Sequence, residues 1–96
     1  MMAAYILVDC KVTDPVRYEQ YKALAPAAIA RYGGRYLVRG GESAVLEGTW
    51  RPNRLVVLEF PRVEQARAFY DSPEYIEARA VRKGAAQMNM VVIGGV

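Results

Sequence analysis

The chain has 96 residues, of which 53% are apolar, and it carries 13 Lys and Arg against 10 Asp and Glu, for a net charge of +3. This length is typical of one domain with a modest core, and we expect a single domain over residues 1–96. No apolar run approaches the roughly 18 residues of a membrane helix, and no secretory signal precedes the first strand-like segment, so we expect a soluble, cytoplasmic protein that does not bind membranes.

The usage of histidine and cysteine narrows the possible chemistry. The chain has no histidine, which removes the usual ligand of haem iron and catalytic zinc and the one side chain that titrates near neutrality without help. Its one cysteine, Cys10, excludes an internal disulfide and a Cys-rich zinc site, and we expect a buried, inert thiol. The basic residues are scattered rather than gathered in a stripe. We therefore expect no metal, no cofactor and no nucleic-acid partner.

The first two predicted elements are a strand and a helix. Side chains from Ala4 to Val12 alternate between an apolar face and a mixed face, which predicts a strand. Asp14 followed by Pro15 is typical of a helix N-terminus, and this helix is expected to run toward Gly33. Pro26 lies inside the helix, where we expect a kink or a restart just before it.

The stretch from Gly33 to Arg62 predicts a hairpin at the centre of a sheet. Its first strand is expected from Tyr36 to Val38 with an extension to Val45 and Leu46, and its second from Leu55 to Phe60. The Gly40-Gly41 pair in the first strand predicts a bulge or a close approach of the backbone.

Helical spacing returns from Val63 to Asp71, and Ser72-Pro73 predicts a cap and a second helix that ends before Gly84. Met88 to Ile93 is expected to form the last strand. The order strand, helix, strand, strand, helix, strand predicts an α+β protein with the ferredoxin-like βαββαβ fold. In that fold both helical units lie on one face of a four-stranded antiparallel sheet.

The sheet face turned away from the helices is expected to be mixed in character. Leu7, Leu37, Leu55 and Val57 fall on it by alternation, and no helix of this chain can cover them. An uncovered aliphatic surface of this kind predicts association, so we expect a homodimer that uses this face.

Three charged residues, Asp9, Arg39 and Glu59, also fall on the mixed face and are expected to converge over one patch if their strands are neighbours. One interpretation is a site for a small anionic or enolisable ligand, with Gly40 and Gly41 leaving room beside the guanidinium. The other is an ion-pair network that fixes an interface.

A second group of candidates surrounds the break between the two C-terminal helices. Tyr70, Ser72 and Tyr75 lie where free N–H groups can hold an anion, although ordinary capping by Ser72 explains the same pattern. Trp50, in the hairpin loop, is interpreted either as a ligand lid or as a contact with a partner subunit. The complete set of candidate pocket residues is Asp9, Arg39, Gly40, Gly41, Trp50, Glu59, Tyr70, Ser72 and Tyr75.

Three segments of the chain resemble a known family: DPVRYEQYKALAPAAIARYGGRYLVRGG, LEGTW with RPNRLVVLEFP, and ARAFYDSPEYIEARAVRKGAA. The most specific pieces are Arg39-Gly40-Gly41, Glu47-Gly48, Glu59-Phe60-Pro61 and Tyr70 to Tyr75. Over nearly its whole length the chain resembles the domain of unknown function 1330 family, DUF 1330, in the dimeric α/β-barrel superfamily. The resemblance implies a homodimer whose sheets face each other, and it assigns no catalytic residue.

Proteins with similar folds include cofactor-independent monooxygenases, muconolactone-isomerase-like enzymes and haem enzymes, and the lack of histidine argues against the haem branch. Two functions therefore remain. One is binding or conversion of a small anionic or aromatic molecule in a cleft, as by a cofactor-independent oxygenase or isomerase. The other is a non-catalytic structural or interaction module whose polar patch fixes the dimer. An RNA-binding sheet of this topology would need exposed aromatic residues on the central strands, which this sequence lacks.

Overall fold

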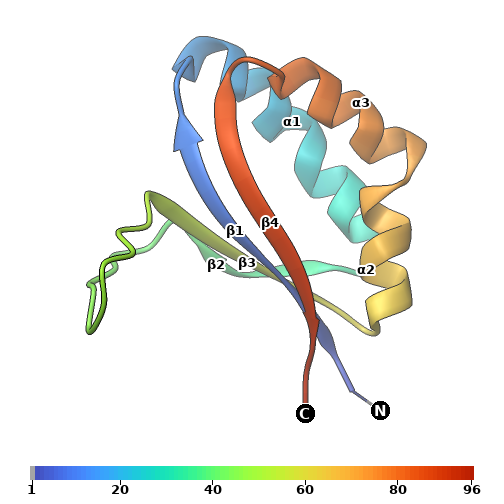
Figure 1. The fold of residues 1–96 in the computed structure, drawn as a ribbon. Coiled ribbons are helices and arrows are strands. Elements are labelled where there is room, and N and C mark those ends of the chain that lie inside the picture. Colours follow the sequence, from blue (N-terminus) through green and yellow to red (C-terminus); the bar gives the residue numbers. More distant parts are fainter. Residues whose placement is uncertain (1) are drawn as a thin grey trace.

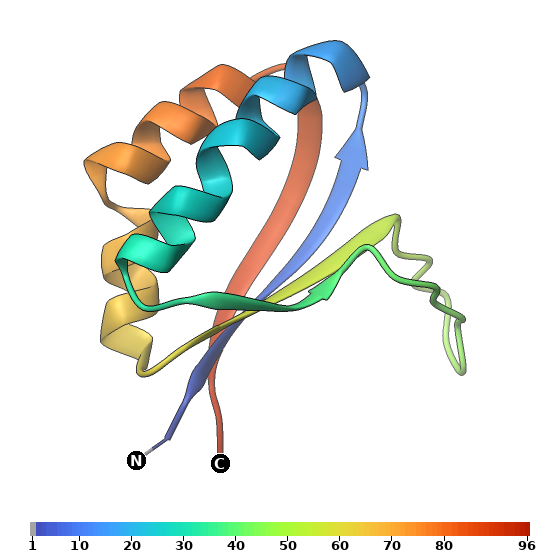
Figure 2. The same cartoon turned by 180° about the vertical axis from the view of Figure 1, so that it is seen from behind.

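The structure is a computed structural model that describes residues 2–96. Its elements are β1 (Ala4–Val12), α1 (Pro15–Arg31), β2 (Arg35–Arg39), β3 (Arg54–Phe60), α2 (Val63–Tyr70), α3 (Pro73–Arg82) and β4 (Ala86–Gly94). The strands form one antiparallel sheet in the order β2-β3-β1-β4. All three helices lie on the same face of the sheet (Figures 1 and 2). The predicted ferredoxin-like βαββαβ fold is confirmed.

The core fills the space between the helices and the sheet. From β1, Ile6, Val8 and Cys10 point toward the helices and are buried. A stack of aromatic rings continues the core under α2 and α3, because the Phe69 ring lies 4.3 Å from that of Tyr75, centroid to centroid. The Cys10 thiol is buried as expected. None of the helices in residues 2–96 is long and apolar enough to cross a membrane.

The helix starts agree with the capping predictions. The Asp14 carboxylate accepts a hydrogen bond of 3.1 Å from the Arg17 N–H, and Ser72 Oγ accepts one of 3.1 Å from the Tyr75 N–H. However, α1 continues from Pro15 to Arg31 without a break, so the predicted restart before Pro26 does not occur. A proline removes a single ladder hydrogen bond, and most of the stability of a protein helix comes from its packed face.

The connection between β2 and β3 differs from the predicted hairpin. β2 ends at Arg39, and residues 40–53 form an irregular arm that projects beyond the sheet, so the expected extension to Val45 and Leu46 is wrong (Figure 1). Gly40 adopts a φ of +70°, and a side chain there would lie 2.6 Å from Arg54 Nε. The strand therefore ends at a left-handed glycine, where the backbone approaches Arg54 closely as the glycine pair predicted.

A β-bulge in β2 determines which way its side chains point. Tyr36 pairs with Leu58, but Val38 pairs with Val57 and Arg39 with Val56, so the register shifts between Tyr36 and Val38. The extra residue reverses the alternation beyond it. Arg39 therefore faces the helices, together with Tyr36.

The sheet face opposite the helices, here called the open face, has no element of this chain over it (Figures 1 and 2). Leu7, Val91 and Ile93 on this face are 41%, 58% and 56% exposed. Leu37 and Val38 of the bulge are also exposed. The mixed face is thus confirmed as an uncovered, partly aliphatic surface.

Candidate functional site

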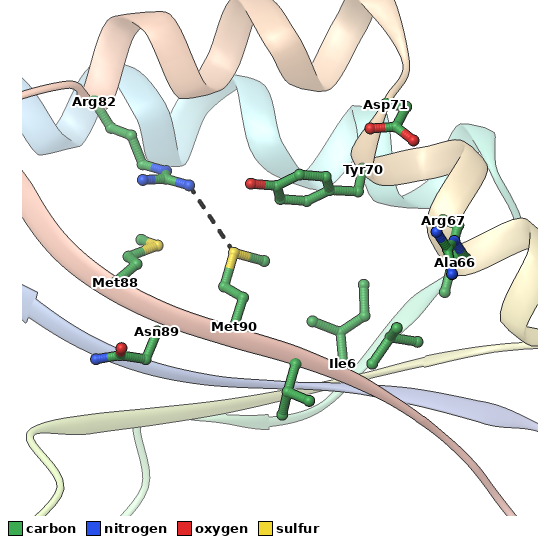
Figure 3. A pocket seen from close by; sticks show the side chains of 11 residues that line it. Ile6, Ala66, Arg67, Tyr70, Asp71, Arg82, Met88, Asn89 and Met90 are labelled. Atoms are coloured by element: carbon green, nitrogen blue, oxygen red, sulfur yellow. Dashed lines mark hydrogen bonds between the residues drawn. The ribbon is translucent and has the colours of Figure 1, made fainter.

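The largest cavity is a cleft of about 790 Å³ between β4 and the helices α2 and α3 (Figure 3). Met88, Met90 and Val92 of β4 form its floor together with Ile6, while Tyr70, from the end of α2, and Arg82, from α3, border it from the helix side. Because β4 is an edge strand, the cleft lies at the border of the sheet. This volume lies within the range of about 300–1,000 Å³ that ligand pockets occupy.

The floor of the cleft follows from the alternation of β4. Met88, Met90 and Val92 pair with Cys10, Val8 and Ile6, and all six residues face the helices. Methionine side chains are flexible and polarisable, so they fit ligands of irregular or aromatic shape and make favourable contacts with aromatic rings. The β4 sequence therefore provides an adaptable apolar surface.

A guanidinium group borders this apolar surface. Arg82 Nη2 donates to Met90 Sδ over 3.9 Å, and in Figure 3 the group points along the cleft toward Tyr70. Arg82 Nε is shielded from solvent and has no hydrogen-bond partner, and Arg82 makes no ion pair within residues 2–96. A charged donor with unused hydrogen-bonding capacity at an apolar cleft is suited to an acidic group of a ligand.

The hydroxyl of Tyr70 is a second polar group at the cleft. It accepts a hydrogen bond of 3.3 Å from Arg79 Nη1, and the Arg79 guanidinium lies 4.1 Å from the centre of the Tyr70 ring. Because Arg79 is only a donor, the hydroxyl hydrogen of Tyr70 stays available for a ligand.

Behind the floor lies a buried pair of tyrosines. The hydroxyl oxygens of Tyr21 and Tyr75 are 2.6 Å apart, and the Tyr75 hydroxyl donates to Met90 Sδ over 3.9 Å. Burial, followed by the interaction with Tyr75, raises the pKa of Tyr21 well above its ordinary value. Both hydroxyls therefore hold Met90 in place as neutral groups.

The expected convergence of Asp9, Arg39 and Glu59 is wrong. Asp9 and Glu59 lie at opposite ends of the β1–β3 pair, since Asp9 pairs with Leu55 while Glu59 pairs with Tyr5. The bulge in β2 turns Arg39 to the helix side, where its guanidinium lies 4.4 Å from the centre of the Tyr36 ring.

The two carboxylates instead hold local structure. Asp9 accepts a hydrogen bond of 2.9 Å from the Asn53 N–H and one of 3.2 Å from Trp50 Nε1, which ties the arm to β1. Glu59 accepts a hydrogen bond of 2.7 Å from Arg35 Nε.

The remaining candidates are dispersed. Tyr70 lines the cleft, whereas Tyr75 is 1% exposed and belongs to the core. Ser72 is buried and caps α3, which is the alternative given above for this residue. Gly40 lies against Arg54, and a side chain at Gly41 would meet no atom within 4 Å.

Residues 3–96 match the family model described as "Domain of unknown function (DUF1330)". The chain belongs to the DUF1330 family. No curated protein matches the sequence of this DUF1330 chain.

Several solved structures are similar to it. A protein of unknown function from Rhodopseudomonas palustris is 17% identical, with a TM-score of 0.78 over 99% of this chain and 83% of the other. SnoaB, a cofactor-independent oxygenase from Streptomyces nogalater, is 14% identical, with a TM-score of 0.66 over 97% and 92%. A dimeric ferredoxin-like protein of unknown function from Thermobifida fusca is 13% identical, with a TM-score of 0.55 over 99% and 92%. Identities this low establish a shared fold alone.

Sequence reasoning missed most of the cleft of this DUF1330 chain. Arg82, Met88 and Met90 were not among the candidates, although two methionines at alternate positions of a strand are a visible signal of a soft apolar surface. Arg82 carried no comparable signal, because its place over the sheet depends on how α3 packs.

Proposed function

We propose that this DUF1330 protein binds a small organic molecule with an apolar or aromatic body and one acidic group in the cleft between β4 and the helices α2 and α3. The observation that carries this proposal is the Arg82 guanidinium, which borders an apolar cleft with a solvent-shielded Nε that has no partner in residues 2–96. A shielded charged donor is costly unless a counter-group pairs with it, and an acidic ligand supplies that group.

The ligand pose follows from the cleft. The body of the ligand lies on Met88 and Met90, where sulfur and ring make favourable contacts. Its carboxylate or phenolate receives hydrogen bonds from Arg82, and the Tyr70 hydroxyl donates a further one. Charge-assisted hydrogen bonds of this type are worth roughly 1.5–3 kcal/mol each.

We further propose that the bound molecule is converted without a cofactor, by oxygenation or isomerisation. The fold shared with SnoaB, described as a cofactor-independent oxygenase, supports this class of reaction. In such a reaction the ligand itself supplies the electrons as an enolate or phenolate, and a fixed guanidinium stabilises that anion. The competing function is a non-catalytic module, and the structural roles of Asp9 and Glu59 support it.

Binding is tested by a thermal-shift screen of hydroxybenzoates and other aromatic acids, followed by calorimetric titration of the hits. Arg82→Met keeps much of the apolar stem and removes the charge, and it should weaken binding about tenfold or more. The control is Arg51→Met, which removes the same charge from the exposed arm and should bind like the wild type. Equal binding by Arg82→Met and the wild type would refute the proposed pose. Oxygen uptake and product analysis with each hit then separate conversion from binding.

We also propose a homodimer in which two open faces meet. Exposed Leu7, Val91 and Ile93 support this assembly, and the structurally similar protein from Thermobifida fusca is described as dimeric. The cytoplasmic location remains a prediction from the sequence.

A further inference from the structure

A second, smaller cavity of about 40 Å³ lies between α1 and the sheet, bordered by the facing ends of β2 and β3. Arg39 and Arg54 line it together with the tyrosines Tyr18 and Tyr36. A cavity needs roughly 10–15 Å³ of this kind of volume to hold one water molecule, so this one can admit a carboxylate group.

The charges around this cavity are unbalanced. Arg54 Nε is shielded from solvent and has no hydrogen-bond partner. Within residues 2–96 no carboxylate oxygen lies within 4.0 Å of the nitrogens of Arg39 or Arg54. The third cation at the cavity, Lys22, is paired with Glu19 at 3.1 Å. Two guanidinium groups therefore border a small cavity without a counter-charge of their own.

Local structure holds these groups in place. Arg39 lies over the Tyr36 ring at 4.4 Å, and the missing side chain of Gly40 leaves space for Arg54, because a Cβ there would lie 2.6 Å from Arg54 Nε. The Cys10 thiol donates to the Tyr18 hydroxyl over 3.5 Å, so the hydrogen of this hydroxyl remains available as a further donor.

We propose that Arg39 and Arg54 form a second binding site, which takes the carboxylate of a small organic acid and is separate from the cleft at Arg82. A planar carboxylate matches the fork of a guanidinium and accepts two parallel hydrogen bonds, whereas a tetrahedral phosphate is bulkier for a cavity of this size. The remainder of the acid projects from the mouth of the cavity, beside the exposed end of Arg39.

The site is tested by NMR observation of the Arg54 Nε–H signal during titration with sodium acetate at constant ionic strength. The signal should shift and saturate. Arg39→Gln should weaken acetate binding about tenfold or more, since it removes a charged donor. The matched control, Arg51→Gln, changes the same charge in the exposed arm and should leave acetate affinity unchanged. Arg82→Met should leave it unchanged as well, which separates this site from the cleft.

Arg39 is exposed, so its substitution should preserve the fold, and circular dichroism verifies this. A shift that never saturates, or an equal loss of affinity in Arg51→Gln, would overturn the site. Tighter binding of inorganic phosphate than of acetate would overturn its assignment to carboxylates.

Discussion

The buried pair of tyrosine hydroxyls offers the sharpest test of how the cleft floor is supported. Each hydroxyl has one hydrogen, and Tyr75 donates its hydrogen to Met90 Sδ, so Tyr21 is the donor in the 2.6 Å contact. Tyr75→Phe removes the acceptor and leaves the Tyr21 hydroxyl unpaired in the core. Tyr21→Phe leaves the Tyr75 hydroxyl with its weak bond to sulfur. Both substitutions should destabilise the fold, and Tyr75→Phe should do so more strongly.

The expected magnitude follows from the cost of a buried, unsatisfied hydroxyl, about 1–3 kcal/mol. For a domain of this size each kcal/mol lowers Tm by roughly 4–8 °C. The double variant removes both hydroxyls and leaves no polar group unpaired, so its loss should be close to that of one single variant. Urea unfolding of the four proteins measures this coupling, with Tyr5→Phe, which has no hydroxyl hydrogen bond in residues 2–96, as the control.

Additive losses in the double variant would refute this reasoning, because additivity means that the two hydroxyls do not interact. A loss of ligand affinity in Tyr75→Phe at unchanged stability would instead return Tyr75 to the pocket, as the sequence alone suggested. The structure expects the reverse, since Tyr75 is 1% exposed.

Three further outcomes are expected. Gly34→Ala should cost about 1–3 kcal/mol in urea unfolding, because the new Cβ would lie 2.5 Å from Phe60 Cε1, whereas Gly41→Ala meets no atom and should stay within about 0.5 kcal/mol of the wild type; equal effects would contradict this packing. Because burial raises the pKa of Tyr21 above its ordinary 10.0, the folded state keeps a proton that the unfolded state loses. The Tyr21 contribution should be constant below pH 10.0 and fall above it by up to about 1.4 kcal/mol per pH unit, and an undiminished slope in Tyr21→Phe would assign the effect elsewhere. Leu7→Glu should give a folded monomer by light scattering, and a dimer that persists at micromolar concentration would refute association through the open face.

The local rules of the sequence predict the elements of this fold well. The alternation of β1, the Asp14 cap and the Ser72 cap are each decided by neighbours in the chain, and the structure contains all three. Arg39 shows where such rules fail. A single bulge residue between Tyr36 and Val38 reverses every face assignment beyond it, and no local pattern placed the bulge there.

The candidate site was harder to predict than the fold because its residues come from elements far apart in the chain. Tyr70 was identified from the helix break, but its neighbour across the cleft, Arg82, is placed only when α3 packs over β4. Charge alone also misled the prediction. Asp9 and Glu59 were selected as reactive carboxylates, whereas they accept hydrogen bonds that hold the arm and Arg35.

The strand β4 relates the two proposed surfaces to each other. Met88 and Met90 face the cleft, while Val91 lies on the open face and also belongs to the cleft lining, because β4 is the edge of the sheet. A second subunit on the open face would therefore border the cleft. If its presence changes the affinity for a ligand by some factor, thermodynamic linkage requires the ligand to change the dimerisation constant by the same factor. The ligand titrations therefore require measurements at several protein concentrations, since affinity and association are then one coupled equilibrium.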